Sequence, residues 1–350
     1  MISLVRKCVK EMNAYVPGEQ PSDPAVVKLN TNENPYPPSP AVMRALKGIA
    51  PDMLRRYPDP DCKDLRAAIA KLHGCKAEQV FVGNGSDEIL ALASRAFVED
   101  DGLLAYFDPS YSLYPVLARI RDVKTFAVGL NNDFSWPARP WRLPAKTGLF
   151  YMTNPNAPTG MLYPKKDVLS FCRKFRRVVI IDEAYADFAR ENDMDLALKL
   201  KNTLVLRTLS KAYSLAGLRV GYAVGPKELI AALFKVKDSY NVDRAAQCLA
   251  LAAINDQAHM RANARRVKAT RERLANALRN MDFEAPPSET NFIWARPGRL
   301  TAKSLFLKLR RKNILVRYFG AGLTREYLRI SIGTDDQINR LLKTISEITD

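Results

Sequence analysis

A lysine, two hydroxyl side chains and an arginine occur close together in the segment RTLSKAYSLAGLRVGY, residues 207–222. Lys211 follows an apolar run that is typical of a buried strand, Thr208 and Ser210 stand beside it, and Arg219 comes eight positions later. A lysine amine can attack a carbonyl group, and a guanidinium forms charge-assisted bonds to a phosphate. The ligand that suits these groups therefore carries a phosphate and a group that a lysine amine can attack.

The turn after the apolar run VFVG opens a predicted helix at NGSDE, residues 84–88. Gly85, Ser86 and Asp87 lie at its start, where free backbone N–H groups and the helix dipole favour an anion. Most such turns are only helix caps, in which a Ser or Asp side chain satisfies the helix end. The turn is a candidate phosphate site, and the residues at the neighbouring strand ends decide between this role and a simple cap.

Three further strand ends present an aromatic ring, an amide and a carboxylate. Tyr111 follows the run LLAYF, Asn156 lies in the turn NPNAPTG, and Asp182 ends the run VVIID three residues before Tyr185. A tyrosine in this place packs or stacks on an aromatic ligand. A carboxylate at the end of a buried strand is costly unless it caps a helix, forms an ion pair or meets a cationic ligand atom. Together the five strand ends require a phosphate, an aromatic ring, a ring cation, a ring oxygen and a group that lysine attacks. Pyridoxal 5′-phosphate has all five.

The elements that must position these residues follow a strand–helix alternation. Nearly continuous apolar runs, typical of strands buried on both faces, are VFVG (80–83), LLAYF (103–107), TFAVG (125–129), LFYMT (149–153), VVIID (178–182), TLVLR (203–207) and VGYAVG (220–225). Helical segments lie between many of them, at 86–97, 112–120 and 165–175. This order predicts an α/β fold with a mostly parallel sheet covered by helices on both faces. Ligands of such sheets bind beyond the carboxyl ends of the strands.

The chain divides into three predicted regions. Residues 1–40 are rich in Pro and Asn and predict an extended arm with turns and no packed element. We expect this arm to pack with the small domain and the substrate site. A large domain over 41–245 and a smaller α+β domain over 246–350 follow, with a long helical region from about 243 to 281. The smaller domain has predicted strands and helices at 291–295, 301–312, 314–318, 327–333 and 335–348.

The composition of the 350-residue chain limits the functions that it can have. The net charge is +17 and the sequence pI about 9.7, but the basic stretches recur at helical spacing and lack a nucleic-acid-binding signature. Five scattered cysteines and two histidines argue against a metal site and favour reduced thiols in the cytoplasm. No segment reaches membrane-spanning length. We therefore expect an enzyme for small anionic molecules, with no nucleic-acid or membrane partner.

The order NGSDE, DPSYSLY, NPNAPTG, IDEAY and TLSKAYSLAGLRVGY resembles the large-domain signature of fold type I pyridoxal-phosphate aminotransferases. The flanking segments KLNTNENPYPPSP, RRYPDP and ILVRYFGAG…EYLRISIGTDD resemble the histidinol-phosphate aminotransferase family more narrowly. The resemblance extends from about Tyr15 to the last helix. It implies a reversible transfer of an amino group from histidinol phosphate to 2-oxoglutarate, which gives imidazole acetol phosphate and glutamate. This is a cytoplasmic reaction of histidine biosynthesis.

The resemblance also implies roles around the cofactor. Lys211 would form the Schiff base with it and later act as general acid and base. Asp182 would pair with the pyridinium nitrogen, Tyr185 and Asn156 would bind the ring oxygen, and Tyr111 would stack on the ring. Residues that would hold the phosphate are Gly85, Ser86, Asp87, Thr208, Ser210 and Arg219.

At the substrate end the resemblance implies that Arg317 and Arg329 grip the phosphate of the substrate. The planar fork of an arginine matches a phosphate or carboxylate at two points, although two surface arginines in a basic protein remain the alternative. Tyr15 and Glu33 match positions that meet the substrate, as does Asn156, with Glu33 near the imidazole. Glu33 has a plainer alternative role, which is to close the turn in NTNENP.

Tyr57 in RRYPDP matches a residue that reaches the phosphate in the neighbouring subunit, which implies a homodimer. Related enzymes that share the cofactor residues leave two alternatives open, an aromatic amino-acid aminotransferase and a threonine-phosphate decarboxylase. A third alternative is a non-catalytic regulator that senses the cofactor, but such regulators carry an added DNA-binding domain, for which we expect no room.

Overall fold

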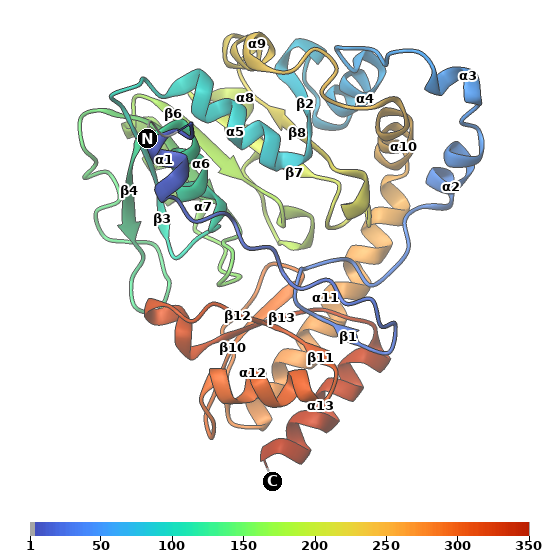
Figure 1. The fold of residues 1–350 in the computed structure, drawn as a ribbon, viewed down its shortest axis with the longest axis vertical. Helices are drawn as coiled ribbons and strands as arrows, with labels where there is room; N and C mark the ends of the chain where they lie inside the picture. The colour runs from blue at the N-terminus through green and yellow to red at the C-terminus, as the bar shows by residue number, and fades with distance from the viewer. Residues whose placement is uncertain (1–3, 350) are drawn as a thin grey trace.

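The computed structural model describes residues 4–349, and a seven-stranded sheet forms the centre of its larger part (Figure 1). In spatial order the strands are β2 (Val80–Asn84), β8 (Val220–Val224), β7 (Thr203–Thr208), β6 (Val178–Asp182), β5 (Thr147–Thr153), β3 (Leu103–Asp108) and β4 (Lys124–Gly129). β8 pairs antiparallel with both of its neighbours, and the other pairs in this sheet are parallel. All seven predicted strands are thereby confirmed, as is the mostly parallel α/β fold.

Consecutive residues of the central strands enter two hydrophobic cores on opposite faces of the sheet. Phe150 belongs to one core and Tyr151 to the other, because side chains alternate across a strand. One face packs against α5 (Gly85–Phe97), α6 (Leu113–Arg121) and α9 (Lys227–Val236). The other face packs against α4 (Lys63–His73), α7 (Lys165–Lys174), α8 (Met194–Lys199) and α10 (Arg244–Asn255). The predicted helices on both faces are therefore confirmed.

The C-terminal part contains a four-stranded antiparallel sheet in the order β12 (Arg317–Tyr318), β13 (Leu328–Ser331), β10 (Phe292–Pro297) and β9 (Phe283–Glu284). Its helices are α11 (Gln257–Asn280), α12 (Ala302–Arg311) and α13 (Asp335–Thr349). The predicted helical region 243–281 is two helices, because the chain breaks at Asp256, whose side chain caps α11 by accepting from the backbone N–H of His259.

The N-terminal arm departs from the prediction. It forms α1 (Lys7–Glu11), which packs on α6, and β1 (Val27–Lys28), followed by α2 (Pro40–Lys47) and α3 (Pro51–Leu54). In Figure 1 the dark blue arm runs from α1 beside the large sheet to β1 beside the C-terminal elements. Leu29 and Asn32 are buried, so the expectation that this region holds no packed element was wrong.

The predicted strand 314–318 was also wrong in its extent. Residues Ile314–Leu315 form β11, which pairs in parallel with β1, whereas Arg317–Tyr318 form β12, which pairs with β13. The two halves of this run therefore belong to two different sheets, and the arm supplies β1 as the partner of β11. None of the helices between residues 4 and 349 is long and apolar enough to cross a membrane.

Candidate active site

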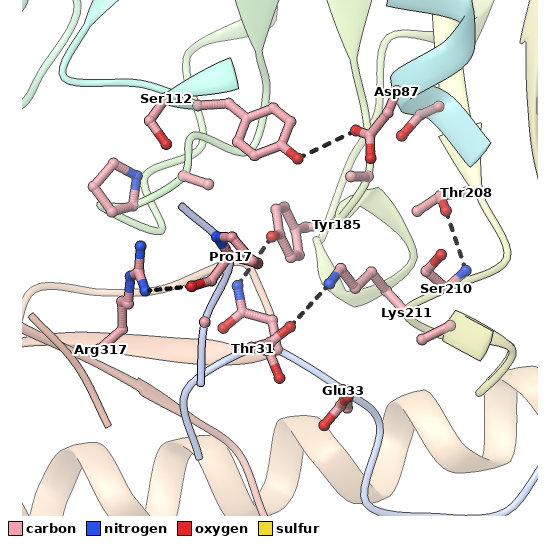
Figure 2. Close-up of a pocket in the computed structure, with 18 of the residues that line it drawn as sticks. Pro17, Thr31, Glu33, Asp87, Ser112, Tyr185, Thr208, Ser210, Lys211 and Arg317 are labelled. Atoms are coloured by element: carbon pink, nitrogen blue, oxygen red, sulfur yellow. Dashed lines mark hydrogen bonds between the residues drawn. The ribbon is translucent and has the colours of Figure 1, made fainter. Parts of the chain in front are cut away.

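A cavity of about 470 Å³ opens where the large sheet, the arm and the small sheet meet. It lies beyond the carboxyl ends of β5, β6 and β7, as expected for a mostly parallel sheet. Most of the residues predicted from the sequence line this cavity. They are Tyr15, Glu33, Ser86, Asp87, Tyr111, Asp182, Tyr185, Thr208, Ser210, Lys211, Arg219, Arg317 and Arg329. Figure 2 shows several of these side chains directed into the same space.

Three predicted residues do not line the cavity. Gly85 lies behind Arg219 at the start of α5. Asn156 is fully buried, and its amide Nδ2 donates to the carbonyl of Pro109 at 3.3 Å. Tyr57 lies on the outer surface, 76% exposed, and its ring stacks on Tyr240 at 4.4 Å between centroids.

Lys211 follows β7 and extends into the cavity, where its Nζ donates to the backbone carbonyl of Thr31 at 3.2 Å (Figure 2). Burial lowers the pKa of Lys211 to about 8, and the positive charge of Arg329 acts in the same direction. A neutral amine is the nucleophilic form of lysine. The neutral, nucleophilic form of Lys211 is therefore available at a lower pH than in an ordinary lysine.

Asp182 lies at the end of β6 and is only 3% exposed. Its carboxylate accepts hydrogen bonds from the backbone N–H of Ala184 and the hydroxyl of Tyr114, each at 3.1 Å. Burial raises the pKa of Asp182 to about 6. Between residues 4 and 349 this carboxylate forms no ion pair, so a cationic atom of a ligand fits beside it.

A candidate anion subsite lies at the N-terminus of the 13-residue helix α5. No side chain caps this helix start, so its first N–H groups are available to a ligand. Arg219 lies beside it, with Nη1 3.4 Å from the Ser210 hydroxyl and Nη2 3.2 Å from an Asp87 carboxylate oxygen. An added Cβ at Gly85 would lie 2.7 Å from Nη2 of Arg219, so glycine allows the guanidinium to approach the helix start.

Two arginines on the small sheet form a second candidate anion subsite. Arg317 and Arg329 are direct partners in the antiparallel pairing of β12 with β13, which places them on one face. Neither pairs with a carboxylate in the described part of the chain, and Nε of Arg329 is buried without a hydrogen-bond partner. Burial lowers the pKa of Arg329, and the charge of Arg317 acts in the same direction. Two neighbouring cations of this kind favour a ligand with a phosphate or carboxylate.

The arm closes the remaining side of the cavity. The ring of Tyr15 meets the ring of Tyr111 edge to face, with 6.0 Å between centroids. Glu33 lines the cavity, but its carboxylate is paired with the ammonium of Lys28. A cationic ligand group would therefore have to compete with Lys28 for Glu33.

Sequence reasoning missed Asn32, which joins the arm to the cavity and to the small sheet. Its amide Nδ2 donates to the hydroxyl oxygen of Tyr185 at 3.0 Å, and its Oδ1 accepts from the hydroxyl of Ser331 at 2.9 Å. Because Tyr185 accepts this bond, its own proton is available for donation into the cavity. The sequence signal was weak: Asn32 adopts φ +56°, a left-handed conformation that asparagine tolerates better than most residues.

The arrangement fits pyridoxal phosphate in its donor set. The α5 subsite suits a phosphate, Asp182 suits a ring cation, Tyr185 offers a donor for a ring oxygen, and Lys211 offers an amine. The arginine pair remains as a separate subsite for an anionic substrate.

Comparisons with known proteins agree with this arrangement. Residues 24–345 match the family model described as aminotransferase class I and II. The chain is 41% identical to the histidinol-phosphate aminotransferase of Rippkaea orientalis over 98% of each chain. It is 43% identical to that of Acinetobacter baumannii strain AYE, over 97% of this chain and 95% of the other. The crystal structure of the Sinorhizobium meliloti enzyme of the same name, in complex with pyridoxal-5′-phosphate, superposes with a TM-score of 0.89 and 22% identity, over 100% of this chain and 98% of that one.

Proposed function

The chain belongs to the histidinol-phosphate aminotransferase family, within the class I and II aminotransferases, and we propose that it transfers the amino group of histidinol phosphate to 2-oxoglutarate. The products are imidazole acetol phosphate and glutamate, and the cofactor is pyridoxal 5′-phosphate. The single observation that carries this substrate is the second anion subsite, Arg317 beside Arg329, which lines the same cavity as the α5 subsite. The same arginine pair suits the carboxylates of glutamate and 2-oxoglutarate in the second half of the cycle.

Pyridoxal phosphate supplies an electron-withdrawing ring that stabilises negative charge on the substrate carbon. Lys211 would anchor the cofactor through Nζ and, when free, would move a proton to and from the substrate carbon. Asp182 holds a proton on the ring nitrogen. Tyr185 donates its proton to the ring oxygen, because its oxygen already accepts from Asn32. Asn156 would become a second donor to that oxygen by giving up its 3.3 Å bond to Pro109.

The remaining residues hold the two ligands in place. Tyr111 covers one face of the ring. The cofactor phosphate is held by the backbone of Gly85, Ser86 and Asp87, by the hydroxyls of Thr208 and Ser210, and by Arg219. Tyr15 and Glu33 contact the imidazole end of the substrate, where an imidazolium replaces Lys28 as the partner of Glu33.

We also propose that the active form is a homodimer in which Tyr57 reaches the cofactor phosphate of the other subunit. Supporting this, Tyr57 and Tyr240 are exposed and line a surface hollow with Leu54 and Arg244. We place the enzyme in the cytoplasm. All five cysteines belong to the described residues and none of them forms a disulfide, as expected of reduced thiols.

The test is an absorption spectrum of the purified protein with pyridoxal phosphate, recorded before and after addition of histidinol phosphate without any keto acid. We expect the yellow band of the lysine-bound cofactor to disappear and the absorption of the amine form to replace it. The Lys211→Ala variant is the control and should show no yellow band. A wild-type protein without that band would contradict the assignment of Lys211.

The same measurement separates the alternative substrates. A band that ignores histidinol phosphate but responds to phenylalanine or tyrosine would make the protein an aromatic aminotransferase. A response to threonine phosphate with release of carbon dioxide would make it a decarboxylase. In either case the cofactor assignment would stand and the proposed substrate would not.

A further inference from the structure

A row of three hydroxyl groups leads through the wall of the cavity to the carboxylate of Asp182. Ser110 Oγ lies 3.1 Å from Thr153 Oγ1, Thr153 Oγ1 lies 2.6 Å from the Tyr114 hydroxyl, and that hydroxyl lies 3.1 Å from Asp182 Oδ2. Tyr114 is 0% exposed and Thr153 is 1% exposed, so the inner part of the row is shielded from water.

The direction of proton donation along this row is fixed by the carboxylate. An ionised carboxylate only accepts, so Tyr114 donates its single proton to Asp182. Tyr114 then accepts from Thr153, and Thr153 in turn accepts from Ser110. Hydrogen bonds that point the same way along a chain polarise and strengthen one another. All three hydroxyls therefore favour negative charge on Asp182.

We propose that Tyr114 is a positioning residue for the transamination: its hydroxyl, supported by Thr153 and Ser110, keeps Asp182 ionised so that the proton stays on the cofactor ring nitrogen. This inference rests on the proposed function for its catalytic meaning, and on the hydrogen-bond geometry alone for its effect on Asp182. Tyr114 does not line the cavity, so it acts through Asp182 and touches neither ligand.

The surroundings of Asp182 make this donor decisive. Burial opposes ionisation of Asp182, and so do the negative charges of Asp87 on α5 and of the adjacent Glu183. Tyr185, which also interacts with Asp182, carries no positive charge. The donors that favour ionisation are the Ala184 N–H and the Tyr114 hydroxyl. With both present the pKa of Asp182 is about 6, so loss of one donor brings the ionisation of Asp182 into the neutral pH range.

A matched control distinguishes this role from simple packing. Tyr114 contacts the rings of Tyr111 and Tyr151, at 5.7 and 4.7 Å between centroids, and Tyr114→Phe keeps these contacts. Tyr151 is equally buried, but its hydroxyl donates to the backbone carbonyl of Leu90 at 2.6 Å. Tyr151→Phe therefore removes a buried hydroxyl beside Tyr114 without removing a donor to Asp182.

The experiment is a carboxyl ¹³C NMR titration of the cofactor-free protein labelled at aspartate, with Asp182→Asn to assign the signal. We expect the midpoint of Asp182 to rise by about one to two pH units in Tyr114→Phe, the shift that corresponds to losing a hydrogen bond to a charged group. Thr153→Val should raise it less, because it removes only the support of Tyr114. Tyr151→Phe should titrate like the wild type.

Two results would overturn the inference: a Tyr114→Phe midpoint equal to that of the wild type, or an equal rise in Tyr151→Phe. If Tyr114→Phe fails to fold, Thr153→Val decides, and a midpoint equal to that of the wild type overturns the proposal.

A second measurement uses the holoenzyme, with pyridoxal phosphate carrying ¹⁵N at the ring nitrogen. At neutral pH the ratio of protonated to unprotonated ring nitrogen should fall about tenfold to a hundredfold in Tyr114→Phe and stay unchanged in Tyr151→Phe. An unchanged ratio in Tyr114→Phe would overturn the link to the cofactor. A wild-type protein that binds no cofactor would instead overturn the proposed function, while the titration of Asp182 would still test Tyr114.

Discussion

At the residue scale, the chemistry of the cavity depends on the charge of Lys211. Three arginines line the same cavity, and Arg329 contributes directly to the lowered pKa of the lysine. Placing the amine among cations and away from water costs least when the amine is neutral. The cationic surroundings that suit two anionic groups therefore also favour the neutral, nucleophilic form of Lys211.

This coupling predicts how Lys211 reacts with pH. In the cofactor-free protein, the rate at which Lys211 captures pyridoxal phosphate should rise with pH and level off with a midpoint near 8, because only the neutral amine attacks. Below pH 8 the amine is mostly protonated. Between pH 8 and the ordinary lysine pKa of 10.5, Lys211 is already mostly neutral, whereas an ordinary lysine is still protonated. Stopped-flow absorbance measures the rate. Arg329→Met should move the midpoint upward, whereas a midpoint near that of an ordinary lysine in the wild type would show that the pocket does not shift Lys211.

The sequence predicted most of the candidate cofactor and substrate residues, but not the residues that hydrogen-bond to them from elsewhere in the chain. Asp182 and Lys211 follow apolar runs and Arg219 precedes one, so their residue types together with their order in the sequence indicated a role. Asn32 and Tyr114 act through contacts with residues more than 60 positions away in the chain, which no local pattern records. Asn156 was predicted to face the ligand, and its present hydrogen bond to Pro109 leaves that role a proposal.

At the element scale, a buried polar network ties together the ends of β5, β6 and β7. Arg207 donates from Nε to Glu183 at 2.6 Å and from Nη1 to Asp187 at 2.8 Å. Glu183 also accepts from the backbone N–H of Asp193, whose carboxylate accepts from Asn154 at 2.6 Å. Each of these strand ends carries a residue of the cavity one or two positions away. The network therefore fixes the spacing between the predicted cofactor ligands.

Replacing Arg207 should destabilise the protein, because it leaves buried carboxylates of the network without their cation. Arg207→Met leaves the fully buried Glu183 without its cation and should lower the free energy of unfolding by about 3–5 kcal/mol. The control is Arg273→Met, which breaks an exposed pair with Asp335 and should cost no more than about 1 kcal/mol. Urea unfolding of the cofactor-free proteins gives both values. Equal losses in the two variants would mean that the buried network does not hold the strand ends.

The inner strands β5, β6 and β7 of the large sheet were predictable because strands buried on both faces are apolar throughout. The division of the run at 314–318 was not, because it depends on β1, which lies almost 300 residues earlier in the sequence. The apolar character of Ile314–Leu315 indicates a strand but not which sheet it joins. The boundaries 1–40, 41–245 and 246–350 stay a prediction.

At the scale of the whole molecule, Tyr57 is the one predicted cofactor residue that lies away from the cavity of its own chain. It is exposed and stacked on Tyr240 at the outer surface, whereas the other predicted ligands gather in or directly behind the cavity wall. A homodimer in which Tyr57 enters the neighbouring cavity resolves this difference, since a symmetric dimer uses the same surface on both subunits. Each cavity would then be complete only in the dimer.

Mixing two defective variants tests this arrangement. Tyr57→Phe should bind pyridoxal phosphate about ten- to a hundredfold more weakly than the wild type, because it loses a hydrogen bond to a charged phosphate. Lys211→Ala should have no turnover. After dissociation and reassociation of an equal mixture, half of the dimers combine one subunit of each kind, and each mixed dimer has one cavity with both Lys211 and Tyr57 intact. Tight cofactor binding and turnover should therefore return in about a quarter of all cavities. If Tyr57 served its own subunit, every cavity in the mixture would keep one defect and no tight site would appear, and a protein that remains monomeric at working concentration would give the same negative result.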